Sequence, residues 1–274
     1  MISARVWKRY FLAQFLLGAY LILTSARGIA EQTNAPTPAP GYASFVCWKY
    51  AKLPQLKAWK ETERIIALTL TEAYPALRKL PREENGSPEQ LKDFLRQLPD
   101  APGQFHIVYL AAHQSPAGQW VFPDGRAVAW DSLMEGLPKL KSPQRLVLLD
   151  SCYAASVNRW PDWSRKIAPA CIFAAPENSL TPDLFVFWRR PVDWAVLFPG
   201  ASRWLRQHQV TASDERISYL GLIWLEAWTK TGAPPQTMRD WRSFAETMTE
   251  ISRHASTQIN AEDVSAISSV FPPD

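Results

Sequence analysis

The chain has 274 residues, of which 47% are hydrophobic and 20% are charged, so its composition is that of an ordinary globular protein. This composition excludes an intrinsically disordered chain, a collagen and a coiled coil, and three cysteines are too few for a disulfide scaffold. The net charge of +4 does not indicate nucleic-acid binding, because the first 30 residues hold four cations and no acid and the remainder is balanced.

Residues 1–30 have the three-part pattern of a secretory signal peptide. Three cations lie within the first nine residues, and residues 10–26 carry no charge. Gly28 and Ala30 place small residues at positions −3 and −1 of a cleavage site after Ala30. The alternative is an uncleaved membrane anchor through residues 10–26, a length at the lower limit for a span. In both cases we expect the rest of the chain to be exported, into the periplasm or out of the cell.

Three further segments follow along the chain. Residues 31–41 contain three prolines and no apolar period, which indicates an extended linker. Between residues 42 and 212 short apolar runs alternate with helical patterns, which predicts an α/β domain. The pattern from residue 213 to 274 is helical again and predicts a helical C-terminal extension.

The α/β domain is predicted to be a three-layer αβα sandwich. Two of its apolar runs are continuous rather than alternating, which indicates strands that are buried on both faces of a parallel sheet. Helices between such strands form crossovers that cover both faces. The predicted strands are residues 42–50, 105–112, 145–149 and 170–175, the hairpin is residues 119–129, and the helices are residues 53–74, 130–140 and one that begins at a Ser87 N-cap.

Two buried strands are followed by residues of catalytic type. One strand leads directly into His113, and the next leads into Asp150, Ser151 and Cys152. Ligands of open parallel sheets bind beyond the carboxyl ends of the strands. A cysteine thiol becomes a nucleophile when a base such as an imidazole lies beside it. The sequence therefore predicts that His113 and Cys152 form a catalytic dyad at one edge of the sheet.

These two segments resemble the caspase-like cysteine peptidases of clan CD. The triplet Asp150-Ser151-Cys152 is most similar to the metacaspase and bacterial caspase-like branch. The resemblance extends over residues 42–197, although only the two catalytic segments are specific. It implies a mostly parallel, six-stranded sheet in the order 2-1-3-4-5-6, with helices on both faces.

The resemblance also implies a role for each residue. Cys152 would be the nucleophile and His113 the general base and acid, and the backbone N–H groups of Gln114 and Cys152 would form the oxyanion hole. Asp150 would line the pocket for the residue before the cleaved bond and select Arg or Lys. The residues alone allow a different role for Asp150, as the N-cap of the following helix.

Two positions depart from the family pattern and keep other functions open. The family has glycine where this chain has Gln114 and Ala155. If Gln114 had to adopt a positive φ, the oxyanion hole would be distorted. One alternative is therefore a catalytically impaired, caspase-like binding module. Another is a different α/β hydrolase or transferase that uses Cys152 as an acyl carrier.

We expect a protein or peptide as the partner and no nucleic acid, and the sequence leaves the oligomeric state open. No pair of cysteine and histidine residues has the spacing of metal ligands, so neither a metal nor a cofactor is expected. His106 lies inside a predicted strand, and we expect a structural imidazole there. Cys47 and Cys171 lie in predicted strands that are not adjacent, so both are expected to be buried and reduced.

Overall fold

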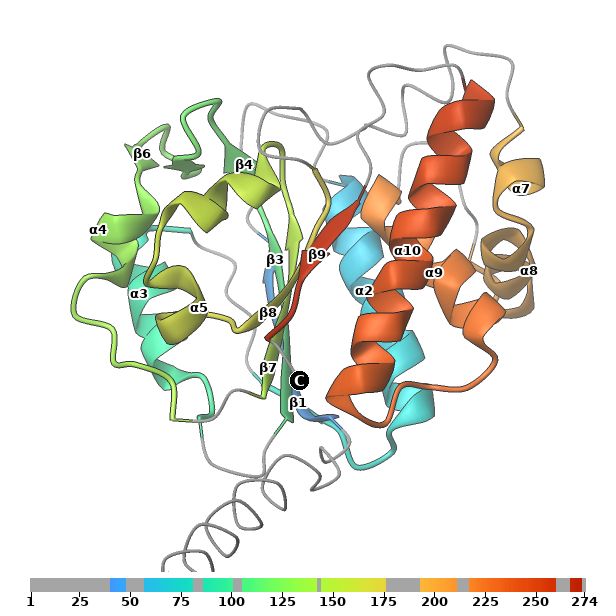
Figure 1. Ribbon diagram of the computed structural model, residues 1–274, viewed down its shortest axis with the longest axis horizontal. Helices are drawn as coiled ribbons and strands as arrows, with labels where there is room; N and C mark the ends of the chain where they lie inside the picture. Colours follow the sequence, from blue (N-terminus) through green and yellow to red (C-terminus); the bar gives the residue numbers. More distant parts are fainter. Residues whose placement is uncertain are drawn as a thin grey trace, which may run out of the picture. The chain divides into compact units, whose positions relative to one another are not determined.

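A six-stranded sheet forms the centre of the described chain (Figure 1). Its strands follow the order β2-β1-β3-β7-β8-β9, and every neighbouring pair is parallel except β8 and β9. Numbered among themselves along the chain, these strands have the order 2-1-3-4-5-6, as the resemblance implied. The strands are β1 (Pro40–Cys47), β2 (Arg78–Lys79), β3 (Phe105–Ala111), β7 (Arg145–Asp150), β8 (Ala170–Phe173) and β9 (Ser268–Val270).

The computed structural model describes part of the chain. The predicted signal peptide or anchor at residues 1–30 lies outside the described residues, and so does most of the predicted linker. No helix within the described ranges is long and apolar enough to cross a membrane. The described residues are 40–47, 57–80, 86–100, 105–141, 144–175, 193–210, 217–259 and 267–272.

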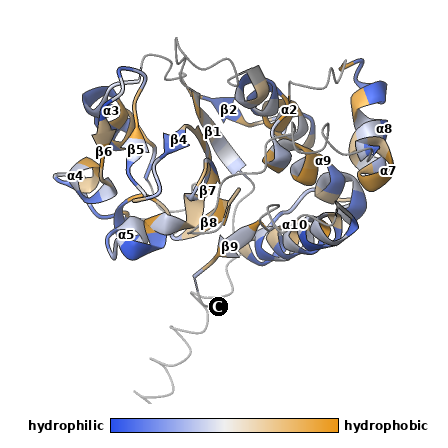
Figure 2. Cartoon of the chain, turned by 90° about the horizontal axis from the view of Figure 1, so that it is seen from above, coloured by the Kyte–Doolittle hydropathy of each residue, from blue (hydrophilic) through white to orange (hydrophobic). Residues whose placement is uncertain are grey.

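Two layers of helices cover the sheet, one on each face (Figures 1 and 2). The pleat of β7 separates the two cores, because Leu148 packs with the cluster on one face and Leu149 with the cluster on the other. The predicted three-layer αβα sandwich is therefore confirmed. One layer holds α3 (Pro88–Gln97), α4 (Trp130–Met134) and α5 (Trp163–Lys166), and the other holds α2 (Lys57–Ala73), α9 (Tyr219–Thr231) and α10 (Met238–Ile259), with α8 (Pro199–Gln207) beside α9.

A second, small sheet follows β3 and contains the predicted hairpin. Its antiparallel strands are β4 (His113–Gln114), β5 (Trp120–Val121) and β6 (Ala127–Val128). The turn between β5 and β6 closes with a bond of 2.9 Å from the Gly125 N–H to the Phe122 carbonyl. Gly125 has a φ of +89°, which a residue with a side chain rarely adopts.

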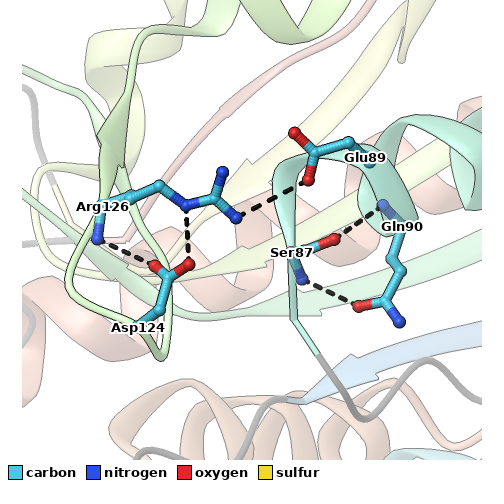
Figure 3. A network of polar contacts seen from close by, with 5 residues as sticks. All are labelled: Ser87, Glu89, Gln90, Asp124 and Arg126. Atoms are coloured by element: carbon cyan, nitrogen blue, oxygen red, sulfur yellow. Dashed lines mark hydrogen bonds and ion pairs between the residues drawn. The ribbon is translucent and has the colours of Figure 1, made fainter.

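The predicted N-cap of α3 is confirmed and forms a complete capping box (Figure 3). Ser87 Oγ accepts from the Gln90 N–H at 3.1 Å, and Gln90 Oε1 accepts from the Ser87 N–H at 3.0 Å. Arg126 in the hairpin turn binds Asp124 at 2.6 Å and approaches Glu89 at 3.6 Å. These exposed ion pairs add little stability, but they link the hairpin turn to the start of α3.

The predicted helical C-terminal part is present and packs directly on the sheet. Trp224 of α9 and Trp241 of α10 are buried, with ring centroids 5.9 Å apart. The indole N–H of Trp224 donates to Thr69 Oγ1 of α2 at 3.0 Å. The helices α9 and α10 lie in the same compact unit as the sheet, which spans Thr37–Pro273. They supply the second helical layer of the sandwich.

Candidate functional site

The predicted neighbourhood of the strands that lead into His113 and Cys152 is confirmed. Strands β3 and β7 are parallel neighbours, and their last residues, Ala111 and Asp150, pair with each other. The Ala112 N–H donates to the Asp150 carbonyl at 3.4 Å, just beyond the ladder. His113 and Cys152 each lie two residues past this pair, so both leave the sheet at the same carboxyl edge.

His113 opens β4 and is half-buried. Its ring lies 5.1 Å from that of Trp59 in α2, measured between centroids. Burial lowers the pKa of His113, because a charged imidazolium is poorly solvated there. The imidazole is therefore neutral at pH 7, and this is the form that can accept a proton from a thiol.

Cys152 follows β7 and is half-buried. Cys171 in β8 is fully enclosed, and burial raises the pKa of its thiol well above the usual value. Reactive cysteines are partly exposed, whereas enclosed ones are inert. Of these two cysteines, Cys152 has the surroundings of a nucleophile and Cys171 those of a core residue. The side chain of Cys47 lies outside the described residues.

The residue after Cys152 has a left-handed backbone. Tyr153 has φ 55° and ψ 25°, and it precedes the 3-10 helix η2 (Ala154–Arg159). A residue with a β-carbon in this conformation costs about 1–2 kcal/mol. Such positions concentrate at functional sites, where the surrounding structure holds them in place. The turn that carries Cys152 is therefore held by its surroundings.

The side chain of Gln114 reaches this turn. Gln114 is 5% exposed, and its amide lies among three groups, the carbonyls of Cys152 and Tyr153 and the indole N–H of Trp130. In the amide orientation that satisfies all three, Nε2 donates to both carbonyls at 3.1 Å and Oε1 accepts from Trp130 Nε1 at 3.2 Å. The segment with His113 and the turn with Cys152 are thus joined by hydrogen bonds.

The two departures from glycine cause no backbone strain. Among the described residues other than glycine, only Tyr153 and Gln209 have a positive φ. Gln114 and Ala155 therefore adopt conformations open to any residue. The Ala155 N–H also donates to the Ala175 carbonyl at 3.1 Å, which ties η2 to the end of β8.

The backbone N–H of Gln114 points away from β5. Gln114 lies opposite Trp120, and the next pair along the ladder is joined by a bond of 2.9 Å from the Ser115 N–H to the Gln119 carbonyl. Opposite pairs alternate between hydrogen-bonded and non-hydrogen-bonded along an antiparallel ladder. The ladder between β4 and β5 therefore leaves this N–H unused, as an oxyanion donor requires. Its catalytic role stays a prediction.

Asp150 lies inside the molecule with no exposed area. Its Oδ2 accepts hydrogen bonds from Tyr109 Oη at 2.8 Å and from Ser218 Oγ at 2.6 Å. Burial raises its pKa to about 6, although the two hydrogen bonds act in the opposite direction. The alternative role as N-cap of the following helix is wrong, because η2 is preceded by Tyr153 and has no side-chain cap.

Three partners of this carboxylate network are not apparent from the sequence as site residues. Ser218 is the N-cap of α9 and accepts from the Gly221 N–H at 3.2 Å. Thr62 of α2 donates to Ser218 Oγ at 3.0 Å and accepts from the Ser218 N–H at 2.8 Å. A serine before a long apolar run signals an N-cap. Its bond to Asp150, and that of Tyr109, depend on how the helical layer packs on the sheet.

His106 and Asp124, the one acidic side chain of the hairpin, have structural surroundings. His106 is 1% exposed, and its Nε2 lies 3.0 Å from Ser44 Oγ, as expected for a structural imidazole. Asp124 pairs with Arg126. Within the described ranges, no group of three or more His, Cys, Asp or Glu side chains could hold a metal ion.

Comparison with known proteins supports the fold. No protein-family model matches the sequence, and no curated protein matches it. Among solved structures, the chain is similar to caspase-1 from Spodoptera frugiperda, with 10% identity over 87% of this chain and 90% of that chain and a TM-score of 0.54. The Drosophila initiator caspase Dronc is also similar, with 9% identity over 85% and 79% of the two chains and a TM-score of 0.44. Raptor from Chaetomium thermophilum has 11% identity over 84% of this chain and 30% of its own, with a TM-score of 0.36. The likeness to caspase-1 and the strand order agree that the chain has a caspase-like fold.

Proposed function

We propose that this protein is an exported, caspase-like cysteine endopeptidase with Cys152 as the nucleophile and His113 as the general base and acid. The observation that carries the proposal is the pairing of Ala111 with Asp150, which brings the segments of both residues to one edge of the sheet. A half-buried thiol and an imidazole held neutral by burial meet the requirements of the two roles.

In the proposed reaction, His113 takes the proton of the Cys152 thiol, and the thiolate attacks the carbonyl carbon of the scissile peptide bond. The oxyanion that forms is bound by the backbone N–H groups of Gln114 and Cys152. His113 then gives its proton to the departing amine, which leaves a thioester on Cys152. Water, deprotonated by the same imidazole, hydrolyses the thioester and restores the thiol.

We propose cleavage after Arg or Lys, with Asp150 as the selecting residue, as in the metacaspase and bacterial branch that the triplet resembles. The carboxylate is buried among hydroxyl groups, and its Oδ1 accepts no hydrogen bond from the described residues. A substrate guanidinium would bind this oxygen and supply the positive charge that a buried carboxylate needs. Because Asp150 has no exposed area, the chain around it must open before a substrate side chain can enter.

The N-terminal segment supports the proposal of export. Residues 1–30 combine an early cluster of cations, an uncharged run and small residues before Glu31. The segment acts either as a signal peptide or as an anchor through residues 10–26. In both cases the catalytic edge would work outside the cytoplasm, on protein or peptide substrates.

A second candidate function is a binding module with the same fold but without turnover. The observation that favours it is the complete burial of Asp150, which closes the proposed specificity pocket in this structure. The two functions differ in whether Cys152 reacts with a substrate-like electrophile.

The test is labelling by electrophilic peptides that end in Arg, Lys or Asp. The proposal expects rapid labelling by the Arg and Lys peptides, slow labelling by the Asp peptide and none in Cys152→Ala. Asp150→Asn retains acceptors for the two hydroxyl groups but removes the charge, so it should slow the Arg peptide much more than an uncharged one. Equal labelling of the wild type and Cys152→Ala would favour the binding module. Equal effects of Asp150→Asn on all peptides would refute the specificity assignment.

A further inference from the structure

Gln114 contacts the turn of Cys152 through its side chain, in addition to the backbone role proposed above. Its Nε2 donates to the carbonyls of Cys152 and Tyr153 at 3.1 Å each. These carbonyls belong to the two peptide planes on either side of the Tyr153 α-carbon. Holding both planes fixes φ and ψ of Tyr153, the residue with the left-handed backbone.

Trp130 sets the direction of the Gln114 amide. The indole N–H of Trp130 donates to Oε1 at 3.2 Å, so the donor end of the amide must face the two carbonyls. Trp130 itself is completely buried, and its ring contacts those of Trp120 and Trp163 at centroid distances of 4.5 and 4.6 Å. The amide is therefore aligned by a fixed aromatic cluster of the α3–α5 layer.

We propose that Gln114 is a positioning residue for Cys152. Its amide fixes the Tyr153 turn and thereby the direction in which the thiol of Cys152 leaves the backbone. This inference rests on the proposed cysteine chemistry and adds a residue to that site. The side chain makes these bonds at a position where a glycine could make none.

The test measures the rate at which iodoacetamide alkylates Cys152 in the full-length protein, read on the Cys152 peptide by mass spectrometry. Gln114→Met keeps the length of the side chain but removes both donors. We expect alkylation to slow at least about fivefold at every pH, because the thiol loses its fixed position. For peptide substrates we expect kcat to fall while KM changes little, since the turn positions the nucleophile rather than the substrate.

Gln114→Glu gives a readout that loss of packing would not. When ionised, the new carboxylate cannot donate and repels both carbonyls, so alkylation should be as slow as in Gln114→Met. When protonated, its O–H donates again, and the rate relative to wild type should recover. Burial next to two carbonyls raises the pKa of the new carboxyl, so recovery should begin above its ordinary pKa of about 4.3. The alkylation rate of Gln114→Met relative to that of the wild type should not vary with pH.

Two tryptophan variants keep the test decisive if Gln114→Met does not fold. Trp130→Phe keeps an aromatic ring but removes the N–H that orients the amide, and it should slow alkylation in the same direction by a smaller factor. Trp163→Phe is the matched control, because Trp163 packs in the same cluster and its Nε1 has no hydrogen-bond partner among the described residues. It should leave the rate unchanged.

The results separate this inference from the proposed function. Wild-type rates in Gln114→Glu and Trp130→Phe, at all pH values, would overturn the positioning role. If His113→Ala hydrolyses peptide substrates as fast as the wild type, the proposed dyad fails instead. The comparison among the Gln114 variants still holds in that case, because it measures the position of the thiol and not turnover.

Discussion

Ser218 Oγ donates to Asp150 Oδ2 across 2.6 Å, and this bond joins the first turn of α9 to the last residue of β7. Ser218 also caps α9 through the Gly221 N–H, so one hydroxyl group serves both a helix end and a buried carboxylate. Asp150 stands two residues before Cys152. The helical C-terminal part is therefore bonded directly to the strand that carries the proposed nucleophile.

Ser218→Ala should destabilise the protein by about 2–4 kcal/mol. The substitution removes an N-cap, worth about 1 kcal/mol, and also leaves a buried carboxylate without one of its donors. Ser87→Ala is the matched control, since Ser87 caps α3 by the same geometry but contacts no buried acid. It should cost only about 1 kcal/mol. Urea unfolding measures the loss of unfolding free energy in each variant. Equal losses in Ser218→Ala and Ser87→Ala would show that the bond to Asp150 contributes nothing to stability.

The pH dependence of stability should contain two opposing contributions. Burial raises the pKa of Asp150 to about 6, so its folded form binds a proton more tightly, and stability falls by about 2 kcal/mol as pH rises from 4 to 6. Burial lowers the pKa of His106 to about 3, so the unfolded chain binds a proton on this imidazole more tightly than the folded protein does. The contribution of His106 to stability is therefore fully present above the unfolded pKa of 6.5 and is lost as pH falls. Between pH 4 and 6 the two contributions partly cancel.

Asp150→Asn removes the first contribution and leaves the second. The variant should therefore lose stability on acidification more steeply than the wild type. The difference in unfolding free energy between the two proteins should change by about 2 kcal/mol between pH 6 and 4, as measured by denaturant unfolding at each pH. Parallel pH profiles would mean that Asp150 titrates as an ordinary carboxyl.

Cys152→Ala should abolish peptidase activity and leave the melting temperature within a few degrees of the wild type. A half-buried thiol contributes little packing, and such substitutions usually change stability by about 0.5 kcal/mol or less. His113→Ala should lose about as much activity, because members of a catalytic unit are not additive. Cys171→Ala, in the core, should remain active but unfold at a lower temperature. Full activity in Cys152→Ala would exclude the proposed nucleophile.

Gly200→Ala should destabilise the protein although it lies in helix α8. Helix propensity alone would favour alanine by about 1 kcal/mol. A β-carbon at residue 200, however, would lie 2.0 Å from Thr229 Oγ1 and 2.9 Å from Glu226 Oε2. We expect a net loss of about 1–3 kcal/mol by thermal unfolding. Adding Thr229→Ala should recover part of the loss, and an additive double mutant would contradict the predicted clash.

Much of the fold follows from local patterns in the sequence. The continuous apolar runs 105–112 and 145–149 predict buried parallel strands, and the structure pairs them with the register that places Ala111 beside Asp150. The hairpin over residues 119–129 and the Ser87 N-cap are also predicted correctly, since turns and caps are satisfied by residues within four positions of each other. The short strands β2 and β9 are missed because they contain only two and three residues, too few for an alternating pattern.

By itself, the sequence pattern determined the sandwich and the edge at which His113 and Cys152 emerge, because side-chain period and crossover handedness are local constraints. The order of the strands was implied only by the resemblance to the caspase-like family. The environment of Asp150 was decided only by the tertiary structure. The pleat turns its carboxylate toward the layer of α2 and α9, where hydroxyl groups from residues 41 and 68 positions away surround it. The contact of the Gln114 amide with the turn of Cys152 depends in the same way on Trp130 from α4. Which buried polar groups come into contact depends on how whole layers pack, and a short stretch of sequence does not determine contacts between residues so far apart in the chain.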